Sequence, residues 1–64
     1  LTPREREILA LIAKGRANKE IGAALGIAED TAKRHVSSIL DKLHLRSRAE
    51  AAAWAVRSGL SSGA

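Results

Sequence analysis

Apolar residues recur at three- and four-residue intervals in four segments of the chain, the spacing that gathers side chains on one face of an α-helix. The first segment begins at Thr2, and Glu5 three residues later completes the capping-box pattern of a helix N-terminus. Gly15 follows the last apolar position and is typical of a helix C-terminus. We therefore expect a first helix with the core-facing residues Ile8, Leu9, Ile12 and Ala13.

The second and third apolar segments are separated by a short turn that contains Gly26. The second segment is brief, and Asn18 is its expected N-cap. The third runs from about residue 29 to 43, and its apolar positions fall within about 100° of arc around a helix axis. Ala28 stands where an N-cap side chain would contribute about 1 kcal/mol, so this helix lacks that bond. The predicted core stripe of the third helix is Ala32, Val36, Ile39, Leu40 and Leu43.

The fourth apolar segment extends from about residue 47 to 58. Ser47 and Glu50 form a second capping-box pattern at its start. Residues 1–60 then form a single all-α domain of four helices. Residues 61–64 contain only Ser, Gly and Ala, and we expect them to form a frayed C-terminal tail.

The composition supports helices and excludes several classes of protein. The apolar residues are mainly Ala, Leu, Ile and Val, with Trp54 as the single aromatic residue, which favours helix over strand. A chain of 64 residues has room for one domain and none for a cleft walled by a second. The absence of Cys excludes disulfides and thiolate zinc sites and favours a reducing, cytoplasmic location. No apolar run approaches the roughly 20 residues that span a bilayer, and no signal peptide is visible, so we expect no membrane partner.

A short helix, a tight turn with Gly26 and a longer helix form a helix-turn-helix pattern over about residues 18–43. In this motif the second helix lies in the major groove of DNA, which is wide enough to admit it. The formal net charge of +4 also suits an anionic partner. The polar face of the third helix is centred on Arg34, Ser37, Asp30 and Asp41, with Lys33 and Ser38 beside them and Thr31, His35 and Lys42 near its border.

The groups on this polar face match the chemistry of base edges and phosphates. Arg34 could donate two hydrogen bonds to a guanine or contact a phosphate, and Lys33 could do either as a point charge. The Ser and Thr hydroxyl groups of the same face could bond to either target, whereas its two acids oppose a purely phosphate-binding role. The alternative interpretation is an ordinary solvated helix face.

The sequence does not predict catalysis. His35 and His44 are nine residues apart, about 180° of helical rotation, so they cannot share a metal ion. No Ser-His-acid arrangement has a plausible pocket, and no glycine-rich phosphate loop is present. We therefore expect a protein that is not an enzyme and uses no cofactor or metal.

Short residue matches in a fixed register run without a gap through residues 1–60. They are Leu1 to Glu5 with Glu7, Asn18 to Ile21, Leu25 to Ile27, Thr31, Lys33, His35, Ile39-Leu40, Lys42-Leu43, Arg46, Arg48, Ala51, Ala52 and Gly59-Leu60. Together they resemble the DNA-binding domain of LuxR/FixJ-type (GerE-like) bacterial transcription regulators. The sequence departs from that family at Ala28, where Ser or Thr is usual, at Ala32, where Val is usual, and at Arg16-Ala17.

The resemblance implies a four-helix domain that binds double-stranded DNA, with its third helix in the major groove. It implies base contacts from Lys33, Arg34 and Ser37 and phosphate contacts from Thr31, Asn18 and Lys19. Further candidate DNA contacts are Ser38, Lys42 and Arg46, with solvated side chains as the alternative for the last two and for Lys19.

The resemblance also implies a homodimer that forms through the outer face of the fourth helix. The candidate interface residues are Ala51, Trp54, Ala55 and Ser58. Core packing is the alternative role for Trp54, and indeed the more conservative one for a lone indole.

A second hypothesis is a helical protein-interaction module that docks on RNA polymerase or on an upstream receiver or sensor domain. The Ala-rich fourth helix and the acids of the third helix motivate it. Salt separates the two hypotheses, because phosphate binding weakens steeply with added salt and apolar docking does not. The chain begins at Leu1 and not at Met, so we interpret it as a piece of a longer protein.

Overall fold

The computed structural model of the chain describes residues 1–60 and contains four α-helices within that range. They are α1 (Pro3–Ala13), α2 (Asn18–Leu25), α3 (Glu29–Lys42) and α4 (Arg48–Arg57). The predicted all-α, four-helix fold is confirmed, although α3 ends one residue early and α4 is one residue shorter at each end than predicted. The fraying predicted for residues 61–64 lies outside the described residues. No helix within residues 1–60 has the length and apolar character required to cross a membrane.

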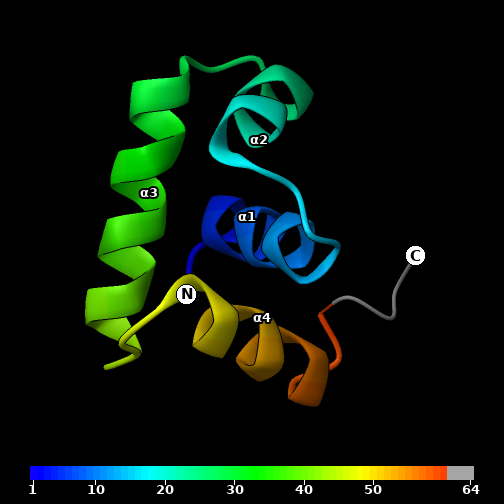
Figure 1. The fold of residues 1–64 in the computed structure, drawn as a ribbon, viewed down its shortest axis with the longest axis vertical. Coiled ribbons are helices and arrows are strands. Elements are labelled where there is room, and N and C mark those ends of the chain that lie inside the picture. Colours follow the sequence, from blue (N-terminus) through cyan, green and yellow to red (C-terminus); the bar gives the residue numbers. More distant parts are fainter. Residues whose placement is uncertain (61–64) are drawn as a thin grey trace.

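The arrangement of the helices leaves one side of α3 uncovered. α1 packs against both α4 and α3, and α2 packs against α3. In Figure 1, α3 stands along one edge of the molecule, and the other three helices all lie to the same side of it. The fold therefore buries one face of α3 and presents the opposite face to solvent.

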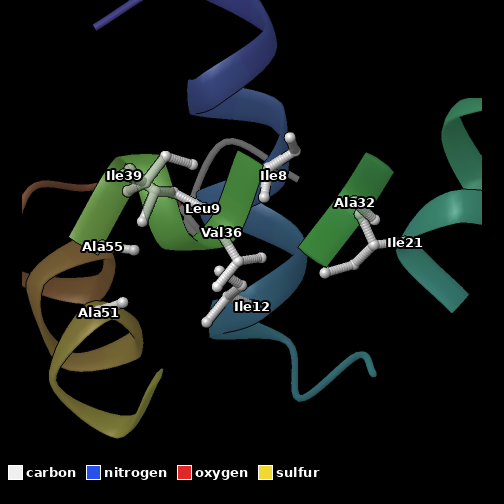
Figure 2. Close-up of a cluster of buried hydrophobic side chains, with 9 residues drawn as sticks. All are labelled: Ile8, Leu9, Ile12, Ile21, Ala32, Val36, Ile39, Ala51 and Ala55. Atoms are coloured by element: carbon white, nitrogen blue, oxygen red, sulfur yellow. The ribbon is translucent and has the colours of Figure 1, made fainter. Parts of the chain in front are cut away.

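A single apolar core joins all four helices, as Figure 2 shows. Transfer of an aliphatic side chain from water into such a core contributes about 1.5–3 kcal/mol. Leu40 and Leu43, which we expected in the core stripe of α3, are only partly buried and pack at the edge of the cluster. The buried cluster consists of Ile8, Leu9, Ile12, Ile21, Ala32, Val36, Ile39, Ala51 and Ala55.

The helix N-termini follow the predicted capping patterns in part. At α1 the box is complete, because Thr2 Oγ1 accepts a hydrogen bond from the Glu5 amide (3.1 Å) and Glu5 Oε1 accepts one from the Thr2 amide (2.8 Å). At α4, Ser47 Oγ accepts from the Glu50 amide (3.2 Å), but the Glu50 carboxylate accepts from the Arg46 amide (2.5 Å) and not from that of Ser47. Only half of the second box therefore forms as predicted.

The prediction that Asn18 caps α2 is wrong. The N-cap is Ala17, which has no side-chain acceptor, and Asn18 is already the first helical residue. Glu20 Oε1 accepts a hydrogen bond from the Ala17 amide at 2.8 Å, which satisfies one backbone donor outside the helix. The side chain of Asn18 is consequently free for another partner.

Two glycines make the turn between α2 and α3 sterically feasible. Gly26 adopts the left-handed conformation (φ 70°) that ends α2, and Ile27 then donates a backbone hydrogen bond to the Gly22 carbonyl at 2.9 Å. Gly22 is buried, and a Cβ atom added there would lie 2.7 Å from the Ile27 carbonyl oxygen. The absence of a side chain at Gly22 thus lets the turn close over the end of α2.

The turn between α3 and α4 contains a residue that is unusual at its position. Leu45 donates a backbone hydrogen bond to the Leu40 carbonyl (2.8 Å), which closes a Schellman-type helix end. His44 occupies the left-handed position of this motif with φ 56°, where glycine is the favoured residue. The chain thereby reverses from α3 into α4 at some conformational cost.

Candidate nucleic-acid interface

The outer face of α3 forms a shallow, open surface of polar side chains. Ala32, Val36 and Ile39 turn to the core, and the rotation of 100° per residue places Arg34 and Ser37 on the opposite side of the helix. This side is the one that Figure 1 shows uncovered by the other helices. The residues that line it are Asp30, Lys33, Arg34, Ser37, Ser38 and Asp41, all of them exposed.

The charges on this face follow an order along the helix. Asp30 lies in the first turn, where the helix dipole stabilises an acid, and Asp41 lies near the other end. Between them are the cations Lys33 and Arg34 and two serine hydroxyls. The centre of the face is therefore basic and rich in hydrogen-bond donors, whereas its two ends are acidic.

The side chains at the centre of this face are not engaged within the protein. Lys33, Arg34, Ser37 and Ser38 form no side-chain hydrogen bond or ion pair with any residue among 1–60. An exposed side chain of this kind keeps its donors available for an external acceptor. The three residues predicted to contact bases and the further candidate Ser38 thus lie together on one accessible surface.

Three other predicted DNA contacts lie away from the centre of this face, on exposed parts of the surface. Thr31 is in the first turn of α3, Lys19 in the first turn of α2, and Arg46 in the turn that precedes α4. None of these three side chains has a hydrogen bond or ion pair within residues 1–60. Their donors are therefore also available for an external acceptor.

Asn18 is held by a residue to which we had assigned no role from the sequence. The Arg48 guanidinium donates from Nη1 to Asn18 Oδ1 at 2.6 Å and from Nη2 to the backbone carbonyl of Arg16. Arg48 lies in the first turn of α4, where the helix dipole disfavours a cation. This unfavourable placement is a sequence signal that could have indicated a tertiary partner for Arg48.

Lys42 is engaged in an ion pair that the sequence did not reveal. Its Nζ lies 3.0 Å from each carboxylate oxygen of Glu5, which is buried in the first turn of α1. The hydrogen bond from the Thr2 amide, followed by that from Lys42, lowers the pKa of Glu5 from 4.5 to about 2. The Lys42 charge is thus matched by Glu5 in the free protein, and its role as a DNA contact stays a prediction.

Two of the four predicted dimer residues are not on the surface of α4. Ala51 and Ala55 are fully buried in the core, so their assignment to the interface is wrong. Trp54 is partly buried against the core, and Ser58 is exposed. The exposed surface of α4 is formed instead by Ala49, Glu50, Ala53, Val56 and Arg57, with Val56 57% exposed.

The described residues offer no site for a metal ion. His35 is half-buried in α3, and His44 is exposed in the following turn. Within residues 1–60 no three His, Asp or Glu side chains come together in a group that could hold a metal ion.

Comparison with known families gives a match over most of the chain. The family model described as "Bacterial regulatory proteins, luxR family" matches residues 1–55. This range includes α1, α2 and α3 and most of α4. The match therefore covers the whole of the candidate interface on α3.

Curated relatives match the same region of the chain. The chain is 57% identical over 54 residues to the nitrate/nitrite response regulator protein NarL of Escherichia coli (strain K12), covering 84% of this chain and 25% of the relative. It is 52% identical over 60 residues to the transcriptional regulatory protein LiaR of Bacillus subtilis (strain 168), covering 94% of this chain and 28% of the relative. It is 50% identical over 60 residues to the response regulator protein VraR of Staphylococcus aureus (strain NCTC 8325 / PS 47), covering 94% of this chain and 29% of the relative. The chain thus spans about a quarter of the length of these relatives.

Proposed function

The chain belongs to the luxR family of bacterial regulatory proteins, and on this premise we propose that it is the sequence-specific DNA-binding domain of a transcription regulator. In this proposal α3 lies in the major groove, and residues on either side of it contact the phosphate backbone. Such a domain works in the bacterial cytoplasm, where the chromosome lies.

The observation that supports this proposal is the outer face of α3. A groove about 12 Å wide admits an α-helix, and the exposed face of α3 is the part of the fold that other helices leave uncovered. Arg34 can donate a bidentate pair to guanine O6 and N7, and Lys33 and Ser37 lie beside it. Their lack of partners within residues 1–60 means that binding breaks no existing contact of theirs.

Phosphate contacts in this proposal come from residues around α3. Lys19 and Asn18 in the first turn of α2 carry donors, and the N-terminus of a helix favours an anion. Thr31, Ser38 and Arg46 add further donors on exposed positions. Backbone contacts of this kind fix the register of the helix in the groove without reading the sequence.

We propose further that two copies bind neighbouring half-sites through the exposed surface of α4. Val56 is the large apolar side chain on that surface, with Ala53 beside it. The predicted interface residues Trp54 and Ser58 lie about 160° around the helix from Val56, at the other edge of the exposed surface. Because the side chains are mostly small, this contact is weak until DNA brings the two copies together. We also propose a second partner, either RNA polymerase or a receiver or sensor domain; the chain spans about a quarter of the length of its curated relatives.

Duplex binding measured by fluorescence anisotropy at several salt concentrations tests the proposal. We expect binding that is tight at low salt and weakens steeply as salt is added, because phosphate contacts release counterions. Arg34→Ala should weaken binding about 5- to 150-fold, because a bidentate base contact is worth about 1–3 kcal/mol. Arg6→Ala is the matched control, since it removes the same side chain from an exposed position on α1 that is assigned to neither the DNA contacts nor the α4 surface. Absence of salt-dependent binding by the folded wild-type chain would overturn the proposal.

A further inference from the structure

One guanidinium group connects the start of α4 to the start of α2. Arg48 donates from Nη1 to Asn18 Oδ1 at 2.6 Å and from Nη2 to the Arg16 carbonyl, across 30 and 32 residues of sequence. Both acceptors lie in the segment that leads from α1 into α2. Arg48 is itself half-buried, so this contact is shielded in part from competing water.

The chemistry of the pair fixes the orientation of the Asn18 amide. A guanidinium has five donors and no acceptor, so the atom that faces it must be the carbonyl oxygen Oδ1 and not the NH₂ group. The Nδ2 donors of Asn18 then point away from Arg48, and they have no partner among residues 1–60. Without this contact the amide is free to rotate, and the outward orientation of its NH₂ group has to be fixed on binding at an entropic cost.

The position of Arg48 argues for a specific role. As the first residue of α4 it places a positive charge at the positive end of the helix dipole, which costs several tenths of a kcal/mol for an exposed residue. The two hydrogen bonds to the α2 segment compensate for this cost, and Arg provides them in a rigid fork that Lys cannot reproduce.

We propose that Arg48 is a positioning residue of the DNA interface, which holds the Asn18 amide with its NH₂ donors turned outward toward a phosphate oxygen. The inference rests on the proposed function and deepens it. A phosphate accepts hydrogen bonds and donates none at neutral pH, so the outward donor is the productive orientation of the amide. Arg48 acts through Asn18 and touches no DNA itself.

A double-mutant cycle on the 64-residue chain tests this inference. The probe is a labelled mixed-sequence duplex of about 20 base pairs, two helical turns, titrated at fixed low salt. The variants are Arg48→Met, which keeps an unbranched apolar stem, Asn18→Ala, and the two combined. Arg6→Met is the control for loss of one exposed positive charge, at a position on α1 that is assigned to neither the DNA contacts nor the α4 surface. Wild type and Arg34→Ala are run alongside, with circular dichroism to confirm that each variant is folded.

We expect Asn18→Ala to weaken binding about tenfold, the value of one hydrogen bond to a charged group. Arg48→Met should weaken it by between about twofold and tenfold, because the freed amide keeps its donors but must be ordered on binding. The double variant should bind as weakly as Asn18→Ala alone, because Arg48 acts through Asn18. Arg6→Met should change affinity by less than about twofold, in keeping with an exposed charge that makes no proposed contact with DNA or with a second copy. If Arg48 has only a structural role, Arg48→Met should lower the thermal stability of the chain, and the losses of binding free energy in the two single variants should add in the double variant.

Losses that multiply in the double variant, or full affinity in folded Arg48→Met, overturn the inference while the proposed function stands. If Arg48→Met does not fold, Arg48→Ala, which also removes every donor of the side chain, takes its place in the same cycle, with the same outcomes. If the wild-type chain fails to bind the duplex at all, the proposed function falls, and the role of Arg48 falls with it.

Discussion

Lys42 at the end of α3 donates hydrogen bonds to both carboxylate oxygens of Glu5 in the first turn of α1, at 3.0 Å each. The pair spans 37 residues of sequence and ties α3 to α1. The Glu5 carboxylate also accepts a hydrogen bond from the Thr2 amide in the capping box of α1, so it stabilises the N-terminus of α1 and binds α3 through Lys42. The orientation of α3, and with it the candidate interface, depends in part on this carboxylate remaining ionised.

Acid should therefore loosen the fold through Glu5. The folded-state pKa of about 2 lies below the ordinary value of 4.5, so the ionised form of Glu5 stabilises the fold at pH values above 4.5. This contribution is lost as the pH falls from about 4.5 toward 2. Thermal unfolding of wild type and Glu5→Gln across this range measures it: the wild type should be more stable at pH 7, and the two should converge in acid. Parallel curves would show that Glu5 is not the group responsible.

Gly22→Ala should destabilise the chain although alanine is the better helix former. Helix propensity alone favours Ala over Gly by about 1 kcal/mol. The added Cβ would lie 2.7 Å from the backbone oxygen of Ile27, however, and a backbone atom of the turn cannot move aside as a flexible side chain could. We expect a net loss of about 1–3 kcal/mol in the free energy of unfolding. Urea denaturation measures it, with Ala24→Gly as the control for propensity at an exposed position, and a gain in stability would contradict the clash.

His44→Gly should stabilise the turn between α3 and α4. His44 has φ 56°, and a left-handed conformation costs an L-residue roughly 1–2 kcal/mol. Glycine avoids this cost, but it loses more conformational entropy on folding, which offsets part of the gain. We expect a net gain of about 0.5–1 kcal/mol, measured as a rise in the urea midpoint. His44→Ala serves as the comparison, because it removes the imidazole but keeps the Cβ. A gain of equal size in His44→Ala would mean that the imidazole, and not the backbone conformation, is the source of the cost.

The isolated chain should be monomeric, or at most a weak dimer, at micromolar concentration. The exposed surface of α4 offers Val56 and a few small side chains, whereas Ala51 and Ala55 are already buried in the core. Specific stable interfaces bury about 800 Å² on each partner, which small side chains on one short helix do not provide. Sedimentation equilibrium measures the mass directly, and a tight dimer at this concentration would show that a larger surface is involved.

The sequence predicted those parts of the structure that depend on local periodicity. Ala32, Val36 and Ile39 lie on one arc of a helix with a polar opposite face, so the buried side of α3, and by subtraction its exposed side, followed from spacing alone. The α1 capping box was likewise confirmed because both partners lie within four residues.

The errors arose where the local pattern is uninformative. α4 contains small apolar residues on all sides, so periodicity could not tell that Ala51 and Ala55 face the core. The Arg48–Asn18 and Lys42–Glu5 contacts join residues 30 and 37 positions apart, and only the packing of the helices brings them together. Asn18 resembles a cap in sequence, but its oxygen is occupied by Arg48.

The measurement that tests the central claim most directly is a titration of the ¹⁵N-labelled chain with duplex DNA, followed residue by residue by NMR. If the outer face of α3 reads DNA, the largest shift changes should fall on Lys33, Arg34, Ser37 and Ser38, with a second group at Asn18 and Lys19. The backbone amides of Val56 and Arg57 on α4 should change little at a single half-site. Shift changes centred on α4 or α1, with the α3 face unperturbed, would contradict the account.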